Sequence, residues 1–323
     1  MGAVISYPDF TLSATLAGGS WTVGLPLNNL KTRFLAEKAR TTSDAAASST
    51  ILVDLGFTAS VRTIGMLAHN VDSTGTVRAR GYSDSAYTTL VTGADTGAVS
   101  PYPAYDAAID KNSIWIYADY MTTLQMALGT IPQDLAYDFN GDGVVNISDA
   151  LIAMAFAQDN PDYPVQFPKN WIYCFSSDKA ARYWKIEISN TNNLDGYIEL
   201  GRLWIGSATF EPAVNVSYGI SMNYESRDII TESLGGVLWW EKRAGKRTLS
   251  AQYDTLTAIE KQQALTMQRH LGLTGELLWI NNSTATAREM IDESFLANLK
   301  SPSPIVNPYF DNYEMSLELL EII

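Results

Sequence analysis

The chain has 323 residues, of which 46% are hydrophobic, and its 22 basic and 35 acidic residues give a net charge of −13. This composition predicts well-packed globular domains and excludes a disordered chain. The acidic balance excludes a protein that holds nucleic acid through bulk electrostatics, so no nucleic-acid binding is predicted. Because no run of about 18 apolar residues occurs, we also predict no membrane insertion.

Short strands separated by turn residues are predicted over the first two hundred residues. In the run 76–82, for example, small apolar residues alternate with Arg78 and Arg80, which is the period of a half-buried strand. Many short strands of this kind indicate a β-sandwich. The predicted strands are 51–57, 61–69, 76–82, 170–175, 181–189 and 196–206.

Four motifs recur in an order that is typical of one fold. They are VDLG at 53–56, IGMLAHN at 64–70, YWKIEI at 183–188 and ELGRLWIG at 199–206. Their order and spacing resemble the galactose-binding-like, or discoidin-type, jelly roll. The resemblance implies an N-terminal jelly-roll β-sandwich domain over 1–207, with any ligand held by loops at one end. No ligand-binding residue can be transferred, because those loops match no motif of the family.

An insertion over 117–164 interrupts this domain. Its first part predicts a short helix at 122–129 that ends at Gly129. A second helix is predicted at 150–157, and it is apolar on nearly every side. A helix without a polar face must be covered on more than one side, either by its own chain or by a partner.

The twelve residues between the two helices, Asp138–Asp149, read DFNGDGVVNISD and predict a calcium-binding loop. Calcium takes six to eight oxygen ligands, which an EF-hand-type loop supplies at fixed offsets. Gly143 lies at the sixth position, where the chain must turn sharply. The predicted ligands are Asp138, Asn140, Asp142, Val144 through its carbonyl, Asn146 through a water, and Asp149.

The last ligand of this loop is Asp149, where the common EF-hand has glutamate. With Val145 and Ile147 as apolar packing positions, the loop resembles the calcium repeat of dockerin domains. Dockerins normally carry two repeats near a terminus, whereas this chain carries one in its interior. We therefore expect a Ca²⁺-binding structural clip and no cohesin docking. The alternative is a surface turn, because Asp, Asn and Gly are also common turn residues.

The pattern changes after residue 208, where a second domain of mixed strands and one helix is predicted over 208–323. The helix spans 256–271 and ends at Gly272, and the last strand alternates between apolar and acidic residues. A hairpin is expected between 237–243 and 247–253. Further strands are expected at 217–227, 276–280 and 313–319, and the apolar stripe of the helix comprises Leu256, Ile259, Ala264, Met267 and Leu271.

Several short motifs in this second domain resemble the minor tail and distal-tail proteins of long-tailed bacteriophages. They are GRLWIG at 201–206, Tyr218-Gly219, Gly235-Gly236, RHLG at 269–272 and ELLEI at 318–322. The resemblance implies a tail-tube-like β-barrel or sandwich with one helix, assembling as a homo-oligomeric ring, with a hexamer expected. It also implies contacts with other tail proteins, a place in the tail tip of the virion, and residence in the bacterial cytoplasm during assembly.

Catalysis is not expected. A nucleophile needs a neighbouring base, usually histidine, and the chain has only His69, at a strand end, and His270, near a helix end. Cys174 has no histidine near it in the sequence, and a buried thiol is the expected state. No phosphate loop, zinc-type cluster or nucleophile elbow occurs. We therefore predict no enzyme.

The tryptophans divide into two groups. Trp239 and Trp240 are neighbours in one predicted strand, so at most one of them faces a core and the other is a candidate interface residue. The remaining six are expected in cores. They are Trp21, Trp115, Trp171, Trp184, Trp204 and Trp279.

Two functions follow as hypotheses. The first is a structural component of a bacteriophage tail tip or baseplate, which extends the tail tube as a ring and carries a calcium-stabilised outer domain. The alternative is a carbohydrate-binding module of a bacterial surface or secreted protein. The two are compatible, because a tail tip can contact host surface glycans.

Overall fold

The computed structural model describes residues 2–72, 74–102, 117–138, 143–152, 169–191, 193, 195–232, 238–241 and 243–323. The chain divides into two compact units. The first joins residues 1–103 to 168–323, and the second is the inserted segment 104–167. The predicted domain boundary between residues 207 and 208 lies inside the first unit and stays a prediction.

Strands are the main regular element of the first unit, which confirms the mainly β prediction. They are β1 (Val4–Asp9), β2 (Thr15–Ala17), β3 (Ala39–Arg40), β4 (Ile51–Leu67), β5 (Thr76–Tyr82), β6 (Leu90–Asp95), β7 (Asn170–Ser189), β8 (Glu199–Leu200), β9 (Arg202–Phe210), β10 (Ser221–Glu225), β11 (Ile229–Glu232), β12 (Leu238–Glu241), β13 (Lys246–Leu256), β14 (Glu276–Ile280), β15 (Phe295–Leu299), β16 (Ile305–Tyr309) and β17 (Asn312–Glu321).

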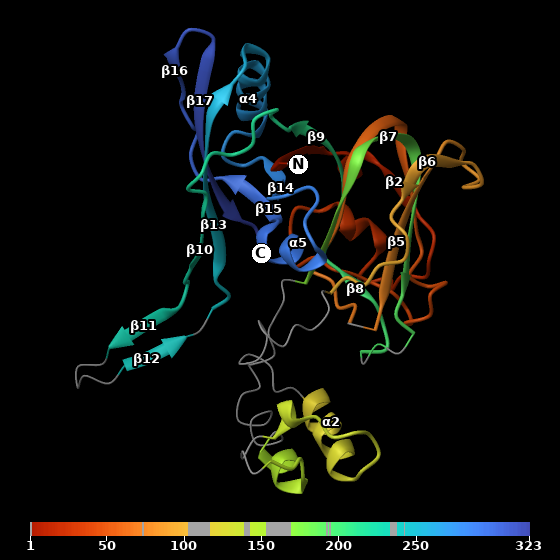
Figure 1. Ribbon diagram of the computed structural model, residues 1–323. Coiled ribbons are helices and arrows are strands. Elements are labelled where there is room, and N and C mark those ends of the chain that lie inside the picture. Colours follow the sequence, from red (N-terminus) through yellow and green to blue (C-terminus); the bar gives the residue numbers. More distant parts are fainter. Residues whose placement is uncertain are drawn as a thin grey trace. The chain divides into compact units, whose positions relative to one another are not determined.

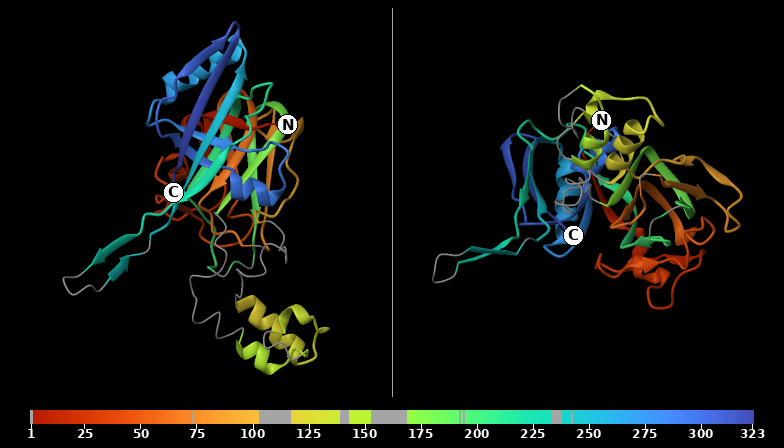
Figure 2. Two further views of the ribbon diagram at one scale, coloured as in Figure 1. Left: turned by 60° about the vertical axis from the view of Figure 1, so that its left-hand side comes forward. Right: turned by 90° about the horizontal axis from the view of Figure 1, so that it is seen from below.

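Thirteen of the described strands join in one antiparallel sheet, with the order β10-β13-β17-β15-β14-β1-β9-β4-β7-β5-β6 and with β2 and β16 at its sides. The sheet curves strongly, and β4, β5, β7 and β9 surround one interior (Figure 1). The strands β13 and β17 form a second layer beside the helix α4 (Figure 2). Strand β1 lies between β9 and β14, so the N-terminus is paired with the C-terminal part of the chain.

Among the described residues, the α-helices are α2 (Tyr117–Ala127), α4 (Ala258–Leu271) and α5 (Ala287–Glu293), and residues 147–152 are also helical. Thr257 caps α4 in a capping box with Glu260, and Gly272 ends the helix. The second predicted helix of the insertion continues to residue 157, and positions 153–157 lie outside the described residues. No described helix is long and apolar enough to cross a membrane.

Two pairs of predicted strands are continuous in the structure. Residues 51–57 and, of the predicted strand 61–69, residues 61–67 belong to β4, and 170–175 and 181–189 belong to β7. The register between these two strands shifts between Asp54 and Ala59. Pairing resumes beyond this bulge, so turn-like residues within a strand do not end it.

The hairpin predicted between 237–243 and 247–253 is wrong. Strand β12 pairs with β11, which precedes it, and β13 pairs with β10 and β17. The residues between β12 and β13 therefore do not form a tight turn between paired strands. They lead from one two-stranded ribbon into the main sheet.

The apolar stripe of α4 is confirmed except at two positions. Ala264, Met267 and Leu271 are buried, whereas Ile259 is 73% exposed, and Leu256 is buried as the last residue of β13, before α4 begins. Ala264 is five positions after Ile259, which places their side chains about 140° apart on a helix of 3.6 residues per turn. Ile259 therefore points away from the core.

The tryptophan predictions are confirmed in part. Trp184, Trp204 and Trp279 are fully buried and Trp171 is nearly so, whereas Trp21 is half-buried and Trp115 lies outside the described residues. Neither tryptophan of the pair 239–240 faces a core, because both are exposed.

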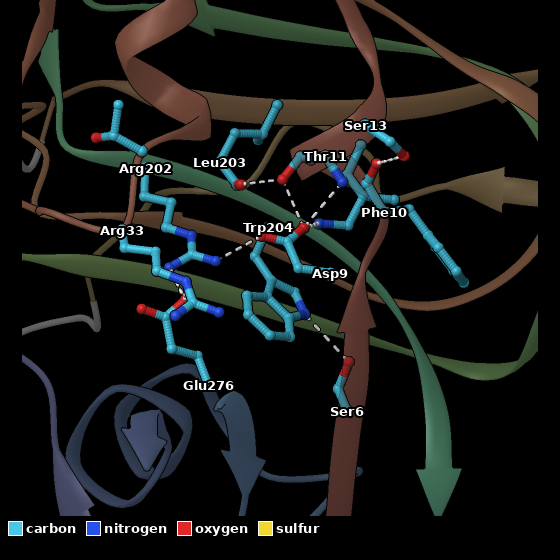
Figure 3. A network of polar contacts seen from close by, with 12 residues as sticks. Ser6, Asp9, Phe10, Thr11, Ser13, Arg33, Arg202, Leu203, Trp204 and Glu276 are labelled. Atoms are coloured by element: carbon cyan, nitrogen blue, oxygen red, sulfur yellow. Dashed lines mark hydrogen bonds and ion pairs between the residues drawn. The ribbon is translucent and has the colours of Figure 1, made fainter. Parts of the chain in front are cut away.

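A buried polar network connects the first and last thirds of the chain (Figure 3). Arg202 on β9 donates to the carboxylates of Asp9, at the end of β1, and of Glu276, at the start of β14. The side chain of Arg202 is fully buried. Burial raises the pKa of Asp9, although Arg202 and the hydrogen bonds from Thr11 act in the opposite direction.

Candidate functional site

The calcium-loop prediction falls partly on described residues. Asp138, Val144, Asn146 and Asp149 are described, whereas Asn140 and Asp142 lie outside the described residues. Gly143 has a φ of +85°, as the sixth position of such a loop requires. Its N–H donates to Asp138 Oδ2 at 2.7 Å, so the first and sixth positions of the loop are in contact.

The end of the loop is tied to the helix that follows. Asp149 is fully buried, and its Oδ2 accepts from the N–H of Asn146 at 2.8 Å. Asn146 Oδ1 accepts from the N–H of Ser148 at 2.7 Å, which caps the helix at 147–152. In the described part of the loop Gly143 has the expected conformation, and Asp138 and Asp149 each accept a hydrogen bond from a backbone N–H of the loop.

The two predicted packing positions of the loop behave differently. Val145 is buried and its carbonyl accepts from Gln133 Nε2 at 2.8 Å, whereas Ile147 is exposed. Within the described ranges, which omit 139–142, no three His, Cys, Asp or Glu side chains form a metal-binding group. The Ca²⁺ site therefore stays a prediction.

A cleft of about 290 Å³ lies in the first unit, where the jelly-roll strands meet the C-terminal part of the chain. This volume is just below the range of about 300–1,000 Å³ that is typical of small-molecule pockets. We call it the seam cleft. It is lined by Val99, Ser100, Pro101, Trp171, Ile172, Tyr173, Cys174, Ser283, Thr284, Ala285, Ala287, Met290 and Ile291.

One wall of the seam cleft is aromatic. Trp171 and Tyr173 lie two residues apart on β7, so their side chains are on the same face of the strand. Their rings are stacked, with centroids 6.3 Å apart and planes inclined by 28°. The ring of Tyr173 also meets Phe175 edge to face at 5.0 Å, which holds its orientation.

The lining of the seam cleft also carries an unpartnered hydroxyl. Ser283 is 8% exposed, and its Oγ is buried without a hydrogen-bond partner. The backbone N–H of Ser283 donates to Gly2 O at 3.2 Å, which fixes this residue next to the N-terminus. A buried hydroxyl without a partner costs about 1–3 kcal/mol, so a ligand that supplies one regains that free energy.

The remaining polar groups of the seam cleft are neutral. Thr284 donates to Asn282 Oδ1 through its N–H at 3.1 Å and its Oγ1 at 3.0 Å, which orders the turn before α5. Ser100 Oγ accepts from the N–H of Tyr102 at 3.3 Å. Among the described residues that line the cleft none is charged, so this lining suits a neutral ligand.

The ionisable groups of the cleft stay uncharged near neutral pH. Burial raises the pKa of the Tyr173 hydroxyl, and the neighbouring Cys174 acts in the same direction. Burial also raises the pKa of the Cys174 thiol, with Arg62 acting in the opposite direction. Cys174 is therefore held as a thiol, which is the unreactive form.

The two histidines have different environments. His270 is exposed near the end of α4. His69 is 1% exposed, and neither ring nitrogen has a hydrogen-bond partner. Burial, with Lys169 and Lys38 nearby, lowers the pKa of His69 to about 3.

The sequence contains no signal that marks the seam cleft. Its walls come from β7 and from the segment before α5, which are more than one hundred residues apart. The helix α5 and its capping Thr286 were not predicted, although T-A-R-E at 286–289 is a capping-box pattern that would have revealed it.

No protein-family model matches the chain, and no curated protein matches it. Among solved structures, it is similar to a mutant of the lectin-binding domain of lectinolysin complexed with Lewis b. The identity is 11% and the TM-score 0.33, and the match covers 63% of this chain and 98% of that one. It is also similar to CBM32-1 of a family 31 glycoside hydrolase from Clostridium perfringens, at 7% identity and a TM-score of 0.34, with 62% and 99% covered.

A further similar structure is the tail of an empty GTA particle with C6 symmetry, at 16% identity and a TM-score of 0.22. That match covers 33% of this chain and 78% of that chain. The first two similar structures are a lectin domain and a carbohydrate-binding module by their names. All three TM-scores are below 0.5, so these similarities carry no argument about what this chain binds.

Proposed function

We propose that the protein binds glycans and that the seam cleft receives one neutral sugar residue, without catalysis. The observation that carries this proposal is the unpartnered Ser283 hydroxyl in a cleft whose lining also includes the stacked pair Trp171 and Tyr173. The uncharged lining and the cleft volume also support it.

A sugar ring has chemical groups that suit both an aromatic ring and a free hydroxyl of the cleft lining. One face of a pyranose presents C–H groups, which pack on an aromatic ring, and its edge presents hydroxyls, which need hydrogen bonds when they are buried. Tyr173 is half-buried and can cover such a face, and Ser283 Oγ can both donate and accept. Because Ser283 lies outside 1–207, we expect the isolated jelly roll to lack a wall of the site.

The test is glycan-array screening of the full chain, followed by calorimetry with the best ligand. We expect Ser283→Ala to weaken binding about threefold to tenfold, since a net hydrogen bond contributes ~1 kcal/mol. Tyr173→Leu should weaken it at least as much. Ser303→Ala is the matched control, because Ser303 is also buried but lies outside the cleft.

Two results would contradict this function. One is an array without any glycan bound above background. The other is a bound glycan whose affinity is unchanged in both cleft variants, which would place the site elsewhere on the chain.

We also propose that the loop Asp138–Asp149 binds one Ca²⁺ and stabilises the inserted unit. The positive φ of Gly143 and its hydrogen bond to Asp138 support this proposal. Asp138, Asn140, Asp142, Val144, Asn146 and Asp149 would supply the oxygens. Three carboxylates in one loop repel each other, and a bound divalent cation removes that repulsion.

A second candidate function is a structural role in a bacteriophage tail tip, where the chain would form a homo-oligomeric ring within the virion. The ribbon of β11 and β12 favours it, because its apolar side chains are exposed in the single chain. Electron microscopy of the purified full chain should then reveal closed rings. A strictly monomeric protein at all concentrations would count against this role.

A further inference from the structure

Apolar side chains make up most of the described lining of the seam cleft. Beside the aromatic pair on β7 they are Val99, Pro101, Ile172, Ala285, Ala287, Met290 and Ile291. An unmodified hexose carries a hydroxyl on nearly every ring carbon, and each hydroxyl that is buried without a partner costs free energy. The lining is therefore better suited to a sugar that carries an apolar substituent.

The apolar residues nearest to Ser283 in the chain belong to α5 and to the turn before it. Ala285 lies two residues after Ser283, and Ala287 is the first residue of α5. Met290 and Ile291 on the same helix are buried. The helix packs against β7, the strand that carries the aromatic pair (Figure 1). The unpartnered hydroxyl and an apolar surface thus belong to one short segment of the chain, 283–291.

Contacts outside the cleft hold α5 in place. Thr286 caps the start of the helix through a capping box with Glu289. Near its end, Arg247 Nη1 donates to the carbonyl of Ile291 at 2.9 Å. The apolar residues of α5 are therefore positioned before a ligand binds, so binding does not have to order them.

Two adjacent hydroxyls of the lining differ in the hydrogen bonds they can still form. Ser283 Oγ is buried without a partner, so its proton is free to donate. Thr284 Oγ1 donates to Asn282 Oδ1 at 3.0 Å, so its oxygen can still accept but its proton is already used. The two residues can therefore give one hydrogen bond and accept one. An amide group needs the same two bonds, because its carbonyl accepts and its N–H donates.

Charge separates this group from other common substituents of sugars. None of the described residues that line the cleft is charged. The ammonium group of an amino sugar or the carboxylate of an acidic sugar would lose its hydration there without a counter-ion, which is costly. An acetamido group is neutral, and it combines an amide with a methyl group.

We infer that the sugar in the seam cleft is N-acetylated and that its acetamido group binds at segment 283–291. The carbonyl oxygen accepts from Ser283 Oγ, the N–H donates to Thr284 Oγ1, and the methyl group packs against Ala287 and the buried side chains of α5. This inference rests on the proposed glycan binding and names the class of sugar that the cleft receives.

The test compares sugars that differ in this one group. Calorimetry with the full chain measures the affinities of N-acetylglucosamine against glucose and of N-acetylgalactosamine against galactose. We expect each acetylated sugar to bind at least about tenfold more tightly, because burial of the methyl group contributes about fourfold and one hydrogen bond about threefold to tenfold. N-formylglucosamine retains the amide without the methyl group, and it should bind about fourfold more weakly than N-acetylglucosamine.

Variants separate recognition of the acetamido group from packing on the sugar ring. Ser283→Ala should lower the preference for the acetylated sugar about threefold or more, because one hydrogen bond is lost. Tyr173→Leu should weaken both sugars of a pair and leave their ratio unchanged. Ala287→Leu should occupy the space of the methyl group and lower the preference as well. Ala258→Leu is its matched control, because both alanines are exposed first residues of capped helices and Ala258 does not line the cleft.

Each outcome has one meaning. Equal affinities within both pairs of sugars would overturn this inference and leave glycan binding standing. A preference that is unchanged in both Ser283→Ala and Ala287→Leu would overturn it too, since the acetamido group would then bind elsewhere. Ala287 is exposed, so Ala287→Leu decides the question if Ser283→Ala does not fold. A chain that binds no glycan at all would overturn both the inference and the proposed function.

Discussion

Arg202 Nη2 donates a hydrogen bond to Asp9 Oδ2 at 2.9 Å, although the two residues are 193 positions apart in the chain (Figure 3). The same guanidinium also donates a hydrogen bond to the carboxylate of Glu276, and it lies 5.4 Å from the centre of the Trp204 ring. One buried cation thereby joins β1, β9 and β14, which are neighbours in the sheet.

Removing this cation should destabilise the fold strongly. Arg202→Met leaves the carboxylates of Asp9 and Glu276 buried without their partner, and we expect a loss of about 3–5 kcal/mol. Urea denaturation measures it. The control is Arg78→Met, because the pair of Arg78 with Asp95 is partly exposed and should contribute under ~1 kcal/mol. Equal losses in the two variants would contradict the role of burial.

His69 should make the protein sensitive to acid. Its pKa is about 3 in the folded chain and 6.5 ordinarily, so only the unfolded chain takes up a proton between these values. The stability that His69 provides is complete above pH 6.5 and is lost as the pH falls toward 3, at about 1.4 kcal/mol per pH unit.

The difference in unfolding free energy between the natural chain and His69→Phe isolates this effect. Phenylalanine is similar in size and does not titrate. Below pH 6.5 the natural chain should therefore lose stability relative to His69→Phe as the pH falls. A difference that is constant from pH 7 to pH 4 would show that His69 is accessible to protons in the folded state.

Calcium should stabilise the inserted unit. At a free concentration one hundred times the Kd, bound Ca²⁺ adds about 2.7 kcal/mol to the stability of the unit that holds it. Melting of the full chain in Ca²⁺ and in chelator measures this gain. Asp142→Ala should abolish it, whereas Asp134→Asn, outside the twelve-residue loop, should retain it. If the chelator leaves the melting profile unchanged, the loop is a surface turn that does not bind Ca²⁺.

Gly206 should tolerate no side chain. A Cβ there would lie 2.5 Å from Ser6 Oγ and 2.6 Å from Trp204 Nε1. These two atoms form a hydrogen bond, in which Trp204 Nε1 donates to Ser6 Oγ at 3.1 Å. We expect Gly206→Ala to destabilise the fold by about 1–3 kcal/mol, because two buried groups must separate. Gly24→Ala meets no atom within 4 Å and should change stability by under ~0.5 kcal/mol.

Local patterns predicted local structure well. The alternation in 313–319 predicted β17, where Met315, Leu317 and Leu319 are buried. The periodicity in 256–271 predicted α4, apart from the orientation of Ile259. Pairing was harder to predict, because register between strands depends on residues far apart in the chain. The hairpin assigned to β12 and β13 failed for that reason.

By itself, the sequence determined the strand-rich architecture and the C-terminal end of α4, because side-chain periodicity and a terminating glycine act over a few residues. Only the tertiary structure decided that β1 lies between β9 and β14, that Ser283, Trp171 and Tyr173 line one cleft, and that both tryptophans of β12 are exposed. Burial and contact arise when distant segments pack together, and a linear pattern does not contain that information.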